Sequence, residues 1–132
     1  MADSNFDLVI LGSGSGGYAA ALRAAQLGLS VALIERDKLG GTCLHRGCIP
    51  TKALLHSAEV ADTTKEAASY GIQATFQGID MPAVNKYRDS IVDKLYKGLT
   101  GLVSMQKSIT FVEGEGRMTG PKTVTVGSES YT

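Results

Sequence analysis

Two cysteines, Cys43 and Cys48, lie five positions apart and are the only cysteines in the 132-residue chain. Five residues of a regular α-helix rise about 7.5 Å, more than the roughly 4.4 to 6.8 Å that a disulfide tolerates between its Cα atoms. The two can bond only across an irregular turn. Gly47 gives the backbone latitude for such a turn, and Pro50 can serve as the first position of a helix behind it. The pair can therefore close locally.

Reversible redox work is the chemistry that best suits this pair. A bridge across so small a loop removes only about 2 kcal/mol of unfolded-chain entropy, which is a weak reason for a structural staple. Two alternatives stay open, namely two buried free thiols and a zinc site built from Cys43, His45 and Cys48. Zinc would need a fourth ligand, His56 is the only other histidine, and the spacing departs from the usual zinc patterns.

A glycine loop precedes the cysteines, with the pattern G-x-G-x-x-G at Gly12, Gly14 and Gly17. A short apolar run leads into it, an alanine-rich stretch follows, and Glu35 closes the next apolar run, as the dinucleotide-binding fingerprint requires. In that fingerprint the glycines permit a tight turn, a close pyrophosphate and a closely packed helix. Glu35 can accept hydrogen bonds from an adenosine ribose. The alternative is a glycine-rich turn beside a solvated glutamate.

The fingerprint alone does not distinguish FAD from NAD. The cysteine pair favours FAD, because a dithiol delivers two electrons most usefully to a flavin. We therefore expect FAD in this first nucleotide-binding unit and NAD on a later segment.

The elements that must position these residues follow from the apolar pattern. The pattern predicts an α/β, Rossmann-like fold with a parallel sheet, flanking helices and an antiparallel ribbon, which the flavin expected from the cysteine pair would make an FAD-binding domain. Expected strands cover 6–11, 30–34 and 109–113, and expected helices cover 14–27, 51–68 and 82–107. The ribbon is expected over 117–132, with turns at Gly120-Pro121 and Gly127-Ser128.

Composition narrows the function classes. An apolar content of 43% over 132 residues allows one ordinary domain. Thirteen basic residues balance thirteen acidic ones without a basic run, so we expect no nucleic-acid partner. No apolar stretch approaches the roughly 20 residues that span a bilayer, and the amino terminus lacks the blocks of a secretory or transit signal. We expect a cytoplasmic protein without a membrane partner.

The segment from Gly40 to Leu55, Gly-Gly-Thr-Cys-Leu-His-Arg-Gly-Cys-Ile-Pro-Thr-Lys-Ala-Leu-Leu, closely resembles the redox-active segment of the flavin-dependent disulfide reductases. This family includes the glutathione and mercuric reductases. The continuation from Ile49 looks more like the branch that oxidises dihydrolipoyl groups than like the glutathione branch. The resemblance covers the whole chain.

The resemblance implies a role for individual residues. Cys43 would be the interchange thiol that exchanges with a lipoyl sulfur, and Cys48 the thiolate that contacts the flavin. Lys52 matches a lysine near the flavin ring that stabilises negative charge, with a solvated helix lysine as the alternative. His45 and Arg46 have no required role and are expected at the surface, and His56 on a helix face. Four further FAD contacts are implied, at Arg36, Gly41, Thr42 and Gly116.

The resemblance also implies that residues 1–132 are the amino-terminal part of the FAD-binding domain, with the NAD, central and dimerisation domains absent. The parent would be a homodimer that oxidises dihydrolipoyl groups on the carrier domains of 2-oxoacid dehydrogenase complexes, through FAD to NAD. Alone, the 132 residues are expected to be inactive and to fold poorly. The alternatives are a related reductase of the mercuric or glutathione type and a truncated, non-catalytic flavin-binding module.

Overall fold

The centre of the fold is a three-stranded parallel sheet, described here from a computed structural model that covers residues 3–132. The strands are β2 (Leu8–Leu11), β3 (Val31–Glu35) and β4 (Ile109–Glu113), in the order β2-β3-β4. Leu33 of β3 pairs with Ile10 on one side and with Phe111 on the other. Residues 31 to 34 are fully buried, which explains why their sequence is apolar without alternation.

Helices cover one face of this sheet. Val31 and Leu33 point toward α1 (Ser15–Gln26) and toward the end of α4 (Met81–Ser104), where they pack with Ala21, Ala24 and Val103. The opposite face carries Ala32 and Ile34. The alternation along β3 therefore joins two cores, one beneath the helices and one beneath a second sheet.

The second sheet is the ribbon that the sequence predicts. Strands β5 (Gly116–Gly120), β6 (Thr123–Val126) and β7 (Glu129–Tyr131) pair in antiparallel order, with turns at the two expected places. Val124 and Tyr131 pack on Ala32 and Ile34 from this side. The sequence pattern did not predict β1 (Asp3–Ser4), which pairs in parallel with β7, because two residues are too few for a periodic signal.

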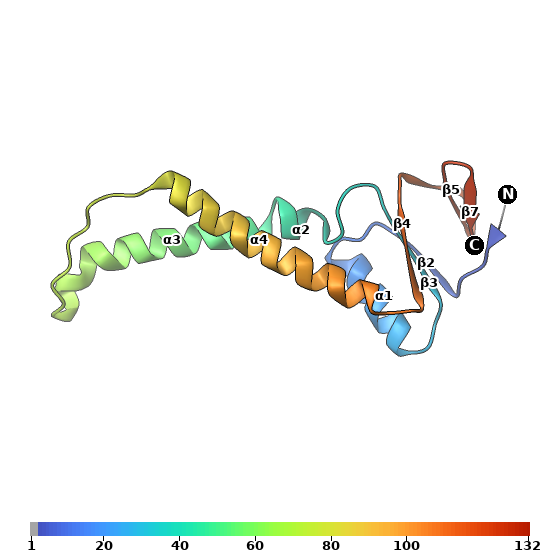
Figure 1. Ribbon diagram of the computed structural model, residues 1–132, viewed down its shortest axis with the longest axis horizontal. Coiled ribbons are helices and arrows are strands. Elements are labelled where there is room, and N and C mark those ends of the chain that lie inside the picture. The colour runs from blue at the N-terminus through green and yellow to red at the C-terminus, as the bar shows by residue number, and fades with distance from the viewer. Residues whose placement is uncertain (1–2) are drawn as a thin grey trace.

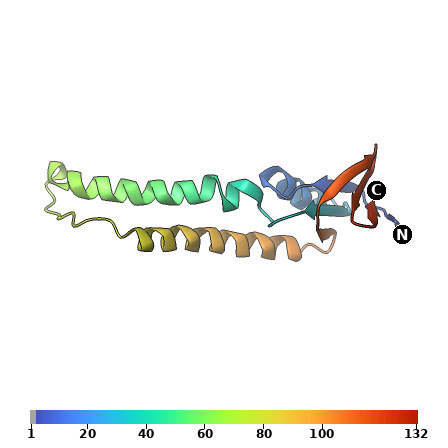
Figure 2. The ribbon, with the colours of Figure 1, turned by 90° about the horizontal axis from the view of Figure 1, so that it is seen from above.

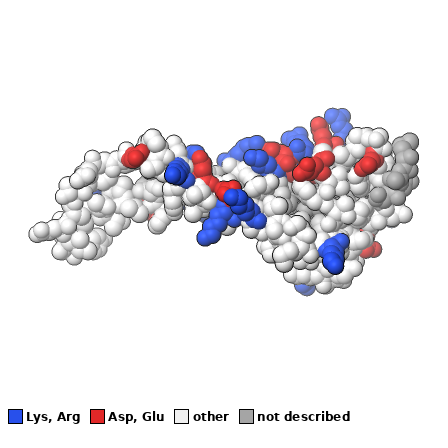
Figure 3. Space-filling model, viewed as in Figure 1, with Lys and Arg blue, Asp and Glu red and all other residues white. Residues whose placement is uncertain are grey.

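A long helical hairpin projects from the sheets (Figures 1 and 2). It consists of α3 (Cys48–Glu66), the short helix η1 (Ala67–Tyr70) and α4, which runs back beside α3. Asp80 caps α4 by accepting a 3.1 Å hydrogen bond from the N–H of Ala83, and Pro82 occupies the first turn. On the face in Figure 3, charges of both signs mix over the middle of the molecule, and the hairpin tip carries few.

The predicted strands and helices are confirmed within about three residues, and the largest differences are that α3 begins at Cys48 and not at Thr51 and that α4 ends at Ser104 and not at Lys107. Pro50 does not force the later start. The first four N–H groups of a helix have no partner within it, so a proline in the first turn removes no hydrogen bond. The N–H of Thr51 bonds to the carbonyl of Gly47 at 3.1 Å, which makes Gly47 the last residue before the helix.

Candidate functional site

The glycine loop lies between the end of β2 and the start of α1, as the fingerprint predicts. A Cβ atom added at Gly17 would stand 1.9 Å from the carbonyl oxygen of Gly12, so only glycine lets the first turn of α1 lie this close to the loop. The helix has no side-chain cap and no acidic residue in its first turn. Its first backbone N–H groups are therefore suited to an anion.

Glu35 closes β3 and binds the glycine loop directly. Its Oε2 accepts 2.8 Å hydrogen bonds from the N–H and the hydroxyl of Ser13, and its Oε1 accepts one of 2.9 Å from the N–H of Asp37. Partial burial alone would raise the pKa of Glu35, but the hydrogen bonds from Ser13 and Asp37 outweigh it, and the pKa is lowered. The carboxylate thus stays ionised and holds the loop against the strand.

Ser13 is a site residue that the motif did not predict. It is the buried polar residue of the described chain, with no exposed surface, and it is satisfied by Glu35. The fingerprint treats its position as variable. The only signal available in the sequence was a small hydroxyl residue between two glycines.

Two adjoining pockets collect most of the predicted nucleotide contacts. One, of about 240 Å³, is bordered by Gly12, Arg36 and Gly116. The other, of about 270 Å³, shares Arg36 and is bordered also by Gly14, Glu35, Gly41 and Thr42. Residues from four separate parts of the chain therefore meet at the carboxyl ends of β2 and β3, where ligands bind in parallel α/β sheets.

Two predicted contacts lie outside these pockets. Gly17 lies against the Gly12 carbonyl and supports the loop from within. Lys52 is exposed on the first turns of α3 and borders neither of the two pockets.

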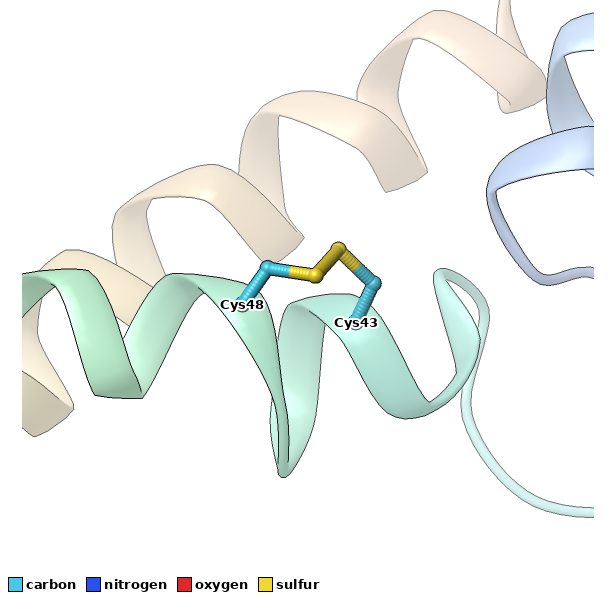
Figure 4. Close-up of a disulfide and its surroundings, with 2 residues drawn as sticks. All are labelled: Cys43 and Cys48. Atoms are coloured by element: carbon cyan, nitrogen blue, oxygen red, sulfur yellow. A yellow bond between two sulfur atoms is a disulfide. The ribbon is translucent and has the colours of Figure 1, made fainter.

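The cysteines form a disulfide across a break between two helices (Figure 4). Cys43 lies on α2 (Gly41–His45), and Cys48 is the first residue of α3. Gly47 between them has non-helical angles, and the Cα atoms of the cysteines are 4.7 Å apart. This confirms that the pair closes through an irregular turn. Cys43 is half-buried, whereas Cys48 is exposed.

The disulfide-bearing helix lies against the glycine loop. Gly41 has a φ of +63°, and a Cβ atom there would stand 2.7 Å from the Cα of Gly14. The N–H of Gly40 also donates a 3.0 Å hydrogen bond to the carbonyl of Ser13. The helix that carries Cys43 thus packs directly on the candidate phosphate loop, although neither cysteine borders the two pockets.

The surface prediction for His45 is wrong. The ring is half-buried, its Nε2 lies 2.9 Å from the carbonyl oxygen of Leu39, and its edge meets Tyr96 at a centroid distance of 5.0 Å. Tyr96 lies far along the chain, on α4, so the residues near His45 in the sequence could not predict this contact. Arg46 is exposed as expected and pairs with Asp37 at 2.7 Å.

The second histidine, the metal-ligating side chains and the helices give the following picture over the described residues. His56 is exposed on α3, as expected, and its Nδ1 lies 3.4 Å from Glu59 of the same helix. Over residues 3–132, no group of three or more His, Cys, Asp or Glu side chains is arranged to hold a metal ion. None of the helices in that range combines the length and the apolar character that crossing a bilayer demands.

Comparison with known proteins agrees with the glycine loop and the disulfide described above. The family model described as pyridine nucleotide-disulphide oxidoreductase matches residues 6–132. The chain belongs to this family. The parallel sheet with its glycine loop and the local disulfide beside it agree with the family's description.

Individual relatives within the family are similar over most of this chain. A dihydrolipoyl dehydrogenase of Bacillus subtilis is 49% identical over 118 residues, which is 89% of this chain and 25% of the relative. A mitochondrial dihydrolipoyl dehydrogenase of Arabidopsis thaliana is 45% identical, over 91% and 24%. A leghemoglobin reductase of Glycine max is 43% identical, over 91% and 23%. The chain therefore spans about a quarter of the length of these relatives.

Proposed function

We propose that residues 1–132 are the amino-terminal part of the FAD-binding domain of a dihydrolipoyl dehydrogenase. The observation that carries this proposal is the contact between Gly41 and Gly14, which sets the disulfide helix α2 against the loop that begins α1. A thiol pair beside a short helix that packs on a candidate phosphate-binding loop suits a disulfide oxidoreductase that uses a flavin. Relatives with this name, at 43–49% identity, support the same assignment.

The two pockets fit the adenosine end of FAD. Gly12 and Gly116 border one pocket and would hold the adenine there, and Arg36 borders both pockets. Glu35 is ionised, and because Ser13 and Asp37 occupy three of its roughly four lone-pair sites, one site on Oε1 is left for a ribose hydroxyl group. The start of α1 and the residues Gly14, Gly41 and Thr42 would hold the pyrophosphate, and Lys52 would approach the flavin ring.

The sulfur chemistry follows from the disulfide. A dihydrolipoyl thiolate attacks the sulfur of Cys43, the Cys43–Cys48 bond breaks, and Cys48 leaves as a thiolate. The second lipoyl thiolate then displaces Cys43, which yields the cyclic lipoyl disulfide and a Cys43 thiolate that takes up a proton. Cys48 lies at the amino terminus of the 19-residue helix α3, where the helix dipole stabilises a sulfur anion.

When bound, FAD supplies the two-electron acceptor for this thiol pair, and NAD is the final acceptor. In a protein of this kind the NAD-binding, central and dimerisation segments would lie outside residues 1–132, and the chain spans about a quarter of the length of its relatives. The physiological reductants are the lipoyl carrier domains of 2-oxoacid dehydrogenase complexes. The full-length protein acts on them as a homodimer, and it does so in the cytoplasm.

Visible absorption of the purified full-length protein tests this proposal. Two-electron reduction should give a long-wavelength charge-transfer band between a thiolate and the flavin. The variant Cys43→Ser should retain a thiolate next to the flavin and show the band without a reductant, whereas Cys48→Ser should lose it. A protein that copurifies with no flavin and takes up none on incubation would contradict the assignment.

A substrate panel separates this function from its relatives. We expect NAD reduction with dihydrolipoamide, and no comparable NADPH oxidation with glutathione disulfide or mercuric ion. The 132 residues alone should show no turnover with dihydrolipoamide and NAD. Turnover confined to glutathione disulfide or mercuric ion would instead identify a sibling reductase.

A further inference from the structure

The helix that carries Cys43 is too short to hold its own position. Helix α2 has five residues, and isolated helices of fewer than about 12 residues are marginal in water. Its place therefore depends on contacts with the rest of the protein. With the disulfide closed, the bond to Cys48 is one of these contacts. Once the disulfide opens, the short backbone connection still tethers Cys43 to Cys48, and non-covalent contacts set the spacing of the two thiols.

Three side chains of this region can anchor α2. Leu44 is buried. Arg46 pairs with Asp37, but the side chains are 69% and 46% exposed, and exposed ion pairs contribute little. His45 makes two directed contacts and is half-buried. His45 is thus the strongest polar anchor at the end of α2 that faces the break at Gly47.

The imidazole of His45 connects α2 with two firmly held parts of the fold. Because the carbonyl of Leu39 can only accept, Nε2 carries the hydrogen and donates it over 2.9 Å. Leu39 is itself part of the core beneath the helices, with 4% of its surface exposed. The ring also meets Tyr96 of α4 edge to face, at 71° between planes.

We infer that His45 is a positioning residue of the redox pair, which keeps Cys43 within closing distance of Cys48 in the dithiol form. The inference rests on the proposed redox role of the pair. Closing the bond removes two electrons and two protons from the two thiols. A helix already held in place loses less freedom in that step, so the effective concentration of one thiol for the other is higher. His45 thereby favours the disulfide.

The equilibrium of the pair with glutathione tests this inference. In that exchange the protein disulfide and two glutathione thiols give the protein dithiol and glutathione disulfide, and acid quenching with thiol alkylation counts the two forms. His45→Ala should lower the equilibrium constant for disulfide formation by about three- to tenfold, and tenfold corresponds to about 30 mV for this two-electron couple. The potential should become less negative.

His56→Ala is the matched control. It removes the same ring from an exposed site on α3, where the ring lies next to Glu59 of the same helix. It should leave the glutathione equilibrium unchanged. Two milder variants separate the two contacts of His45. His45→Gln keeps an N–H donor and His45→Phe keeps a ring edge, so each should recover part of the shift. They also serve if His45→Ala fails to fold.

Three results would overturn the inference. One is a fall in thermal stability of the His45 variants with no change in the glutathione equilibrium. Another is an equal shift in His56→Ala, and a third is a shift toward more negative potential. The readout needs neither flavin nor lipoyl substrate. A protein that fails to oxidise dihydrolipoamide but still responds to His45→Ala would refute the proposed function and leave the positioning role intact.

Discussion

The backbone of Gly41 lies against that of Gly14, so that a Cβ atom at Gly41 would stand 2.7 Å from the Gly14 Cα. This contact joins two motifs that are separated in the sequence by a whole helix and strand. One motif offers backbone N–H groups to an anion, and the other carries a disulfide. The contact places the helix that carries Cys43 directly beside the candidate anion-binding loop.

Gly41→Ala should disrupt this contact. The φ of +63° is unfavourable for alanine, and the added methyl group meets backbone that cannot rotate away. We expect a loss of about 3 kcal/mol in the free energy of unfolding, together with at least tenfold weaker FAD binding. Urea denaturation and flavin fluorescence titration measure the two effects.

Gly71→Ala is the control for backbone strain alone. Gly71 has a similar φ of +74°, but nothing lies within 4 Å of an added Cβ. It should cost about 1 kcal/mol and leave FAD affinity unchanged. Equal losses in the two variants would show that the contact with Gly14 contributes nothing.

Gly17 and Gly16 provide a second pair of neighbouring substitutions with opposite expected signs. An alanine at Gly17 would place its Cβ 1.9 Å from the Gly12 carbonyl oxygen, which should destabilise the fold by about 2 kcal/mol or more. An alanine at Gly16 meets nothing within 4 Å and should stabilise α1 by about 0.5 kcal/mol. Thermal unfolding of both variants decides the matter, and a destabilised Gly16→Ala would contradict the packing described here.

Much of the site was predictable because its signals are local. The spacing of Cys43 and Cys48 around Gly47 sets whether a disulfide can close, and the glycine loop carries its own spacing rule. The apolar run of β3 was visible for the same reason, since a strand buried on both faces needs an unbroken apolar sequence, and the shorter runs of β2 and β4 follow the same pattern less strictly.

The missed features depend on partners that are distant along the chain. His45 was predicted at the surface because nothing near it indicates that Tyr96 of α4 will meet its ring. Ser13 was overlooked because its value lies in the bond to Glu35 across the sheet edge. Arg36 and Gly116 were assigned only through the family resemblance, and their shared pocket wall depends on how the two sheets pack.

The disulfide itself should contribute little to stability. It closes a loop with a sequence separation of five, so reduction should lower the free energy of unfolding by only about 2 kcal/mol. Urea denaturation with and without dithiothreitol measures this difference. The double variant Cys43→Ser/Cys48→Ser should show no response to the reductant. Complete unfolding of the wild type by reductant would mean that the bond is a structural staple.

Glu35 should give the fold a specific dependence on pH. Burial alone would raise its pKa, but the hydrogen bonds from Ser13 and Asp37 lower it below its ordinary value of 4.5. A lowered pKa in the folded state means that the unfolded chain takes up this proton first as the pH falls. The stabilisation is therefore fully present above about pH 5 and is lost as the pH falls through the folded-state pKa.

Glu35→Gln should remove this contribution. The difference in the free energy of unfolding between wild type and variant should be constant near neutral pH and shrink below pH 5, as measured by urea denaturation at a series of pH values. Asp7→Asn is the control, because the pKa of Asp7 is lowered in the same direction by hydrogen bonds from Ser30, away from the two pockets. Both variants should flatten the acid limb of the stability curve, but only Glu35→Gln should also weaken FAD binding. A stability difference that grows on acidification would show that the Glu35 carboxylate is not held ionised by the loop.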